Sequence, residues 1–263
     1  MEYIVSLSLD IREINISNKN LTILPDLSKY TCLQKLDCSG NRITQLSNLP
    51  SSLLELNCSL NRIIQLDNLP YSLQTLYCYT NRLTQLNNLP SFLLELNCSN
   101  NQLAQLNNLP SSLQVLDCSG NRLTQLNNLP SSLLKLRCLY NQIAQLDNLS
   151  SSLQELSCLH NQITQLDNLP SSLQKIDCSH NQITQLSNLP SSLQKLDCSH
   201  NQLKQLDNLP LSLQILYCYC DQLRNNNLEY WKEQTTNRNK KLELLKKKFC
   251  VRKIQRQWRK YWL

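Results

Sequence analysis

Glycine is almost absent from this chain, since only two of its 263 residues are glycines, Gly40 and Gly120. A globular domain of this length normally uses many more glycines in its turns. Asn, which tolerates left-handed backbone geometry and hydrogen-bonds its own main chain, is the expected substitute. Two isolated glycines also exclude a glycine-rich phosphate-binding loop.

Long apolar runs and basic leader segments are missing as well. No run of about 18 apolar residues occurs, so we expect no transmembrane helix. The start, MEYIVSLSLD, has an acid at Glu2 and no basic region, so we expect no secretory signal. The 13 cysteines should then remain thiols in a reducing compartment. The expected location is intracellular and cytoplasmic, with the cytoplasm of a host cell as one alternative.

Charge is divided unevenly along the chain. Twelve Lys or Arg and three acids follow Asn227, so this tail has a net charge of +9. Because the whole chain has a net charge of +7, the preceding body has a net charge of −2. The molecule is therefore a near-neutral body followed by a strongly basic tail.

A repeat of 20 residues runs without insertion from Leu33 to about Leu223. Its pattern is LxxLxCxxNx(I/L)xxL, and the first copy places it at Leu33, Leu36, Cys38, Asn41, Ile43 and Leu46. The L-x-C alternation predicts a short half-buried strand, and stacked copies predict a parallel sheet with about 4.8 Å per coil. We expect the Asn to turn the chain and bond backbone groups of adjacent coils. The ten cysteines of the column should pack as small buried apolar groups.

The other half of each repeat reads QLxNLPxSL, which leaves no room for a full helix. A proline in eight coils favours extended or polyproline-like backbone there. These prolines are Pro50, Pro70, Pro90, Pro110, Pro130, Pro170, Pro190 and Pro210. Ser150 replaces the proline once and should be a mild local weak point.

The ends of the array diverge from the repeat, as terminal coils must to shield an apolar end. Residues 1–32 are expected to form an N-terminal cap and a divergent first coil, with Lys19 where the Asn belongs. Residues 33–226 form the predicted solenoid. Residues 227–263 are expected to hold a C-terminal cap, with Leu228 and Trp231 as its lid, followed by a basic amphipathic helix.

The extended pattern L-x-x-L-x-x-L-P-x-x-L-x-x-L-x-C-x-x-N resembles the short leucine-rich repeats of bacterial effectors that enter host cells. The likeness covers roughly Ile11 to Leu223, although Asp, Asn or Ser, as at Ser47, replaces the first proline of that family's L-P-x-L-P pattern. The Asn-, Ile- and Lys-rich composition is also similar to repeat proteins of large amoeba-infecting viruses. The resemblance implies a leucine-rich-repeat horseshoe whose strands line a concave face, with an extended convex side and a C-terminal α-helix.

The resemblance also bears on activity. Some relatives carry a ubiquitin-ligase domain after the repeats, whereas only a short tail follows here. Its cysteine, Cys250, lacks the acidic neighbour of the ligase motif. We therefore expect no enzymatic activity and no cofactor.

Leucine-rich solenoids usually bind partners on the sheet face, where the variable strand positions lie. The variable columns carry opposite charges close together within single coils, as at Lys35 and Asp37. Neighbouring coils should place these charges within reach of one another, which predicts a self-paired surface of low net charge. Tyr and Arg, which are enriched in binding hot spots, interrupt it. These residues are Tyr77, Tyr79, Arg137, Tyr140, Tyr217 and Tyr219. Drift after duplication explains the Tyr pairs equally well, since exposed aromatics on a sheet also simply pack laterally.

The three histidines of the chain, His160, His180 and His200, occupy one column. Imidazoles one strand spacing apart could bind a metal or titrate near neutrality. No Asp, Glu or Cys shares the column in those coils, so we favour a solvated ladder made by duplication and predict no metal site. The column remains a candidate part of the partner-binding face.

The tail offers a second candidate function. Ile254, Gln255 and Arg259 match the first half of an IQ motif, and Trp258 lies on the same apolar stripe. A basic amphipathic helix of this kind binds calmodulin-like proteins, acidic membranes or nucleic acid. The sequence therefore predicts a protein-binding scaffold that uses its concave face, with a tail-borne function as the alternative.

Overall fold

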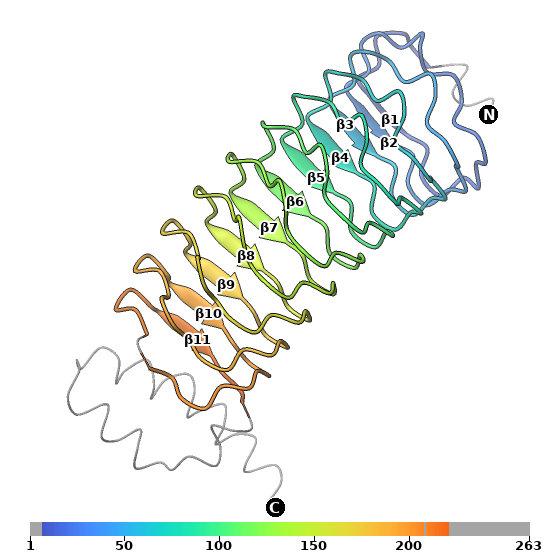
Figure 1. Cartoon of the computed structure of the whole chain (residues 1–263). Helices are drawn as coiled ribbons and strands as arrows, with labels where there is room; N and C mark the ends of the chain where they lie inside the picture. The colour runs from blue at the N-terminus through green and yellow to red at the C-terminus, as the bar shows by residue number, and fades with distance from the viewer. Residues whose placement is uncertain (1–6, 208, 221–263) are drawn as a thin grey trace, which may run out of the picture. The chain divides into compact units, whose positions relative to one another are not determined.

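The computed structural model describes residues 7–207 and 209–220, which form a β-solenoid (Figure 1). Each coil contributes one strand of three residues. The strands are β1 (Glu13–Asn15), β2 (Lys35–Asp37), β3 (Glu55–Asn57), β4 (Thr75–Tyr77), β5 (Glu95–Asn97), β6 (Val115–Asp117), β7 (Lys135–Arg137), β8 (Glu155–Ser157), β9 (Lys175–Asp177), β10 (Lys195–Asp197) and β11 (Ile215–Tyr217). No helix occurs within the described residues. The predicted C-terminal helix and the Leu228–Trp231 lid lie outside them.

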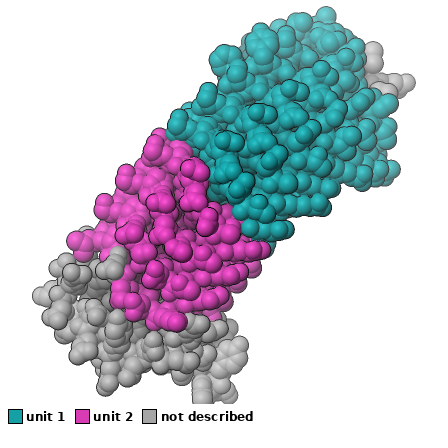
Figure 2. All heavy atoms as spheres, in the orientation of Figure 1, with its two compact units in different colours: residues 1–142 teal, residues 143–263 magenta. Residues whose placement is uncertain are grey.

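The chain divides into two compact units, residues 1–142 and 143–263 (Figure 2). In the first unit β1 to β7 pair in chain order, and in the second β8 to β11 do the same, always in parallel. The register is constant: Leu36 pairs with Leu56, and Leu56 with Leu76. A repeat of fixed length places equivalent residues side by side, which confirms the predicted parallel stacking. The divergent first coil follows the same rule, because Ile14 pairs with Leu36.

The core of each unit consists of columns of identical residues. The middle residue of each strand points inward, and the Leu, Ile and Cys columns from coil 33 to coil 193 are at most 8% exposed. Cys38 to Cys198 are fully buried, as predicted for packing groups. Burial raises the pKa of the Cys58 and Cys138 thiols to about 12. The prediction fails at the last member, because Cys218 is only half-buried.

The repeat asparagines form a second buried column, which we call the asparagine ladder (Asn41, Asn61, Asn81, Asn101, Asn121, Asn141, Asn161, Asn181 and Asn201). Asn101 shows the pattern: its Nδ2 donates to the carbonyls of Cys98 in its own coil (3.0 Å) and Cys78 in the preceding coil (3.1 Å). Its Oδ1 accepts the backbone N–H of Leu83 at 2.9 Å. The ladder therefore joins adjacent coils through groups that the short strands leave unpaired.

Left-handed backbone falls at two positions of each coil from Gly40 to Asn188, neither of which is the ladder asparagine. One is the asparagine before the Leu-Pro pair, from Asn48 (φ 53°) to Asn188 (φ 55°). The other is the residue just before the ladder, which is Gly40 and Gly120 in two coils. Asn thus does substitute for glycine, but the turn that we assigned to the Asn41 column lies one residue earlier. Leu60, Thr80 and Tyr140 adopt the same conformation, which non-glycine residues rarely do.

The side opposite the strands has no helix in the described coils, as the prolines predicted. The Pro50 carbonyl accepts the backbone N–H of Leu53 at 3.2 Å and closes a turn before the next strand. Ser150 makes the same turn, since its carbonyl accepts the N–H of Leu153 at 3.1 Å. The replacement of proline therefore preserves the local geometry of this coil.

Candidate functional site

The first and third residues of each strand point away from the core and form what we call the open sheet face. Their side chains are half-buried or exposed in every strand, while the middle residue is buried in β1 to β10. This face corresponds to the predicted concave surface. Because the core columns are constant, variation between coils is concentrated here.

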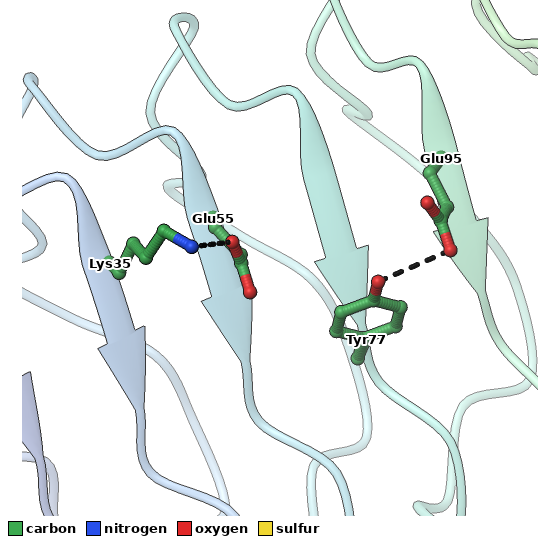
Figure 3. Close-up of polar contacts among 4 residues, drawn as sticks. All are labelled: Lys35, Glu55, Tyr77 and Glu95. Carbon is green, nitrogen blue, oxygen red and sulfur yellow. Dashed lines mark hydrogen bonds and ion pairs between the residues drawn. The ribbon is translucent and has the colours of Figure 1, made fainter.

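In the first unit, polar side chains of adjacent strands meet across this face (Figure 3). Lys35 Nζ of β2 lies 2.9 Å from Glu55 Oε2 of β3. The Tyr77 hydroxyl of β4 donates to Glu95 Oε1 of β5 at 3.2 Å. Glu55 raises the pKa of Lys35, and burial together with Glu95 raises the pKa of Tyr77. These polar groups therefore pair between neighbouring coils, as the sequence led us to expect.

In the second unit, the same cross-strand pairing recurs. Lys175 Nζ of β9 lies 2.7 Å from Glu155 Oε1 of β8. Lys195 Nζ of β10 lies 5.7 Å from the centre of the Tyr217 ring of β11, within cation–π range. Pairing of this kind leaves little free charge on the face.

A local turn closes the carboxyl end of seven strands. The third strand residue is Asp or Asn, and its side-chain oxygen accepts the backbone N–H of a Ser two residues later. Asp37 accepts from Ser39 at 2.9 Å, and Asp117 from Ser119 at 3.0 Å. The remaining examples start at Asn15, Asn57, Asn97, Asp177 and Asp197. We call this sequence, Asp/Asn-Cys/Ile-Ser, the strand-end turn. Asx turns satisfy backbone donors where a strand ends.

Four described coils lack the strand-end turn, and three of these carry the Tyr and Arg residues that the sequence singled out. Tyr77-Cys78-Tyr79 and Tyr217-Cys218-Tyr219 replace both partners of the turn at once, as does Arg137-Cys138-Leu139. The fourth coil carries Ser157-Cys158-Leu159. The Leu139 N–H instead bonds Ser119 Oγ of the preceding coil at 3.3 Å, and the Tyr219 N–H bonds Ser199 Oγ at 3.2 Å.

The large side chains of these coils differ in exposure. Tyr77, Tyr79 and Tyr217 are half-buried, and Arg137 is exposed. Tyr140 is 58% exposed and has φ 51°. Tyr77 and Arg137 lie on β4 and β7, three strand spacings apart or about 14 Å, so one partner could contact both.

The histidines form the predicted column in the second unit. The ring centroids of His160 and His180 are 4.2 Å apart, as are those of His180 and His200, and both pairs are stacked. The Tyr219 ring follows at 5.1 Å from His200. Desolvation, followed by the neighbouring His200 and His160, lowers the pKa of His180. Stacked rings direct their nitrogens side by side instead of toward one point. The described residues contain no group of three His, Cys, Asp or Glu that could hold a metal.

The sequence analysis missed the strand-end turn, although its signal was present as Asp/Asn-Cys-Ser in six repeats. It also missed Cys220, which lies beside Cys218. The tail candidates Ile254, Gln255, Trp258 and Arg259 lie outside the described residues. Among the residues that are described, no helix is long and apolar enough to cross a membrane.

Comparison with known proteins identifies the repeat. A family model of leucine-rich repeats in two copies matches residues 151–191 and 171–211, and a single-repeat model matches residues 32–56 and 112–136. Comparison with curated proteins gives no significant match.

Solved structures are similar over most of the chain. YopM from Yersinia enterocolitica is 40% identical with a TM-score of 0.70, covering 75% of this chain and 44% of its own. YopM of Yersinia pestis, described as a leucine-rich effector protein, is 29% identical with a TM-score of 0.74, at coverages of 80% and 65%. The functional domain of InlJ from Listeria monocytogenes, which includes a cysteine ladder, is 31% identical with a TM-score of 0.60, at coverages of 81% and 54%. The chain thus spans about half the length of the structures that it matches. Its repeats are leucine-rich repeats, and it is similar to leucine-rich-repeat proteins over most of its length.

Proposed function

We propose that this chain is a protein-binding scaffold that holds its partner on the open sheet face. Most contacts would come from the coils without a strand-end turn, through Tyr77 and Arg137 on the face and through Tyr79 and Tyr140 just after these strands. In the second unit, Tyr217 on the face would be joined by Tyr219 and the histidine column, which follow the strands and include coils that keep the turn. Protein binding is typical of leucine-rich-repeat domains, and this constant core with a variable face is suited to it.

The observation that carries the proposal is the joint loss of both turn residues. The strand-end turn satisfies a backbone N–H and requires small polar residues at two positions, and seven coils have it. Where it is lost, Tyr or Arg stands on the face in three of four coils. Large, rigid aromatic side chains and Arg give the largest binding contributions at interfaces. In two of these coils Ser119 Oγ and Ser199 Oγ accept the Leu139 and Tyr219 N–H groups instead, so the backbone donor stays satisfied without the turn. We attribute the choice of large side chains at these positions to a partner.

The test reverts these coils to the repeat consensus. Affinity capture with the full chain first identifies the partner. Tyr77→Asp with Tyr79→Ser, and separately Arg137→Asp with Leu139→Ser, then restore the strand-end turn that other coils already contain. We expect each reversion to weaken binding at least about tenfold, as loss of a hot spot does, without loss of stability. Asp117→Asn is the matched control, because both residues occur naturally in the turn. Unchanged affinity in both reversions would contradict the site assignment.

The compartment and mode of action belong to the same proposal. We place the protein inside a cell, in a host cell if it acts as the effector-like relatives suggest. The buried thiol columns are consistent with a reducing environment. We assign it binding and not catalysis, without a cofactor.

A second candidate function rests on the basic tail. Its +9 charge and the Ile254-Gln255-Trp258-Arg259 stripe favour a calmodulin-like protein, an acidic membrane or nucleic acid as the contact. Capture by the chain ending at Tyr230 separates the two functions. Partners retained by the shortened chain support the face, whereas partners lost with the tail, and lost at high salt, support the alternative.

A further inference from the structure

The last described coil departs from the repeat at Cys220. This residue occupies the column just before the ladder, whose other members from Gly40 to His200 are half-buried or exposed. Cys220 is only 7% exposed. Its side chain therefore turns inward where the equivalent side chains turn outward.

The cause lies in the asparagine ladder. Asp221 stands where the next ladder asparagine belongs, and a carboxylate cannot donate to the Cys198 carbonyl as an amide would. Cys220 Sγ instead donates to this carbonyl at 3.5 Å. The thiol thus takes the place of the missing amide as a donor to the Cys198 carbonyl.

This inward turn brings two sulfurs together. Cys220 Sγ lies 3.6 Å from Cys218 Sγ, within the same coil. Along the rest of the column, successive cysteines belong to different coils. Cys218 is half-buried and Cys220 is buried, so a reagent reaches Cys218 first. We call Cys218 and Cys220 the terminal thiol pair.

We propose that the terminal thiol pair is a covalent modification site, which closes to an intrachain disulfide by exchange with a small-molecule disulfide such as oxidised glutathione. Cys218 loses its proton and attacks one sulfur of oxidised glutathione. The glutathione S–S bond breaks, and one glutathione leaves as a thiol. Cys220 then attacks Cys218 Sγ, the mixed disulfide breaks, and the second glutathione leaves with the proton from Cys220. Two electrons pass from the two cysteines to glutathione, and the reaction is reversible.

Closure would change the end of the solenoid. The Cys198 carbonyl loses its thiol donor, because a disulfide sulfur carries no hydrogen. The affected segment also carries Tyr217 and Tyr219, which alternate with the two cysteines. Oxidation of the terminal thiol pair would therefore act on the same coil as these aromatic side chains.

The experiment follows one peptide of the full-length chain. In a background with Cys32→Ser and Cys250→Ser, the folded protein is equilibrated with mixtures of reduced and oxidised glutathione, quenched with acid and digested with trypsin. The peptide from Gln205 to Arg224 contains Cys218 and Cys220 and no other cysteine. We expect it to become lighter by two hydrogens, with Cys178 and Cys198 still reduced. The equilibrium constant should exceed that of the free synthetic peptide at least about tenfold, because the fold holds the sulfurs together.

Two variants check the order of events. Cys220→Ser keeps a hydroxyl that can donate to the Cys198 carbonyl, and it should accumulate a glutathione adduct on Cys218. Cys218→Ser should accumulate little adduct, since Cys220 is buried. The proposal is overturned if the wild-type peptide closes no more readily than the free peptide. It is equally overturned if glutathione adducts accumulate without closure, or if oxidation occurs only at other cysteines. The wild-type result decides the matter whether or not either variant folds.

Discussion

Removal of a single ladder amide, Asn101→Ala, should destabilise the first unit more than any surface change in the same coil. The Cys78 carbonyl keeps its bond from Asn81 (3.1 Å), and the Cys98 carbonyl keeps its bond from Asn121 (3.1 Å). The Leu83 N–H, in contrast, donates to Asn101 Oδ1 at 2.9 Å and loses this acceptor. An orphaned buried donor costs about 1–3 kcal/mol, and each lost net hydrogen bond about 0.5–1.5 kcal/mol. With two carbonyl bonds lost, the sum is about 4 kcal/mol.

The measurement is urea unfolding followed by circular dichroism, with hydrogen exchange of the Leu83 amide as a local readout. Gln105→Ala, an exposed amide in the same coil, is the matched control and should change stability by less than about 0.5 kcal/mol. Asn101→Asp keeps an oxygen that accepts the Leu83 N–H, so the Leu83 amide should stay protected from exchange. Its carboxylate cannot donate to the Cys78 and Cys98 carbonyls and is repelled by them, so the unit should still be destabilised. The reasoning is refuted if Asn101→Ala behaves like Gln105→Ala, or if Leu83 exchange is unchanged.

Three further substitutions test the left-handed position at Gly120, the proline position at Ser150 and the histidine column at His180. Gly120→Ala should lower the free energy of unfolding by about 1–2 kcal/mol, because φ at this position is +63° and the new Cβ would lie 2.4 Å from Asn100 Oδ1. Adding Asn100→Gly should remove this clash and recover part of the loss in thermal melts. Ser150→Pro should stabilise by about 0.4–1 kcal/mol by restricting the unfolded chain, and a lower melting temperature would show that this coil rejects proline. The lowered pKa of His180 means that the native chain binds its proton less tightly than the unfolded chain, so stability should fall as pH drops through 6.5. His180→Asn should reduce this loss between pH 7.5 and 5.5, and an unchanged slope would contradict the assignment.

The fold was largely predictable, because a constant repeat length allows only one way of stacking the coils. Leu36, Cys38 and Asn41 recur at fixed spacing, and only parallel in-register stacking buries all three columns together. The left-handed positions were harder to predict, since Leu60, Thr80 and Tyr140 have no intrinsic preference for that conformation. Stacking imposes it on them, because each coil must turn at the same point as its neighbours. The inward turn of Cys220 was unpredictable for a similar reason: it responds to a missing amide in the next position.

The candidate site was predictable only as a set of unusual residues. The sequence indicated Tyr77, Arg137 and Tyr217, but not that each coil had lost a hydrogen-bonded turn. Pairing between neighbouring coils was expected, but the particular pairs were not named, because Lys35 and Glu55 are 20 residues apart and meet only after stacking. Local sequence therefore predicts which side chains face outward, while the neighbouring coil determines what each of them contacts.

In a repeat of this regularity, a departure from consensus indicates function only where no neighbouring residue compensates for it. Gly40 lies beneath Asn18, whose side chain occupies the space that a Cβ would need. Cys220 supplies the hydrogen bond to the Cys198 carbonyl that a carboxylate at Asp221 cannot donate, and the three histidines stack on one another. These departures are explained within the chain. Arg137 and Tyr140 are exposed in a coil that has no strand-end turn. Ser119 Oγ of the preceding coil accepts the Leu139 N–H there, and this hydrogen bond accounts for the backbone but not for the large exposed side chains. Arg137 and Tyr140 are therefore the first positions to test for contact with a partner.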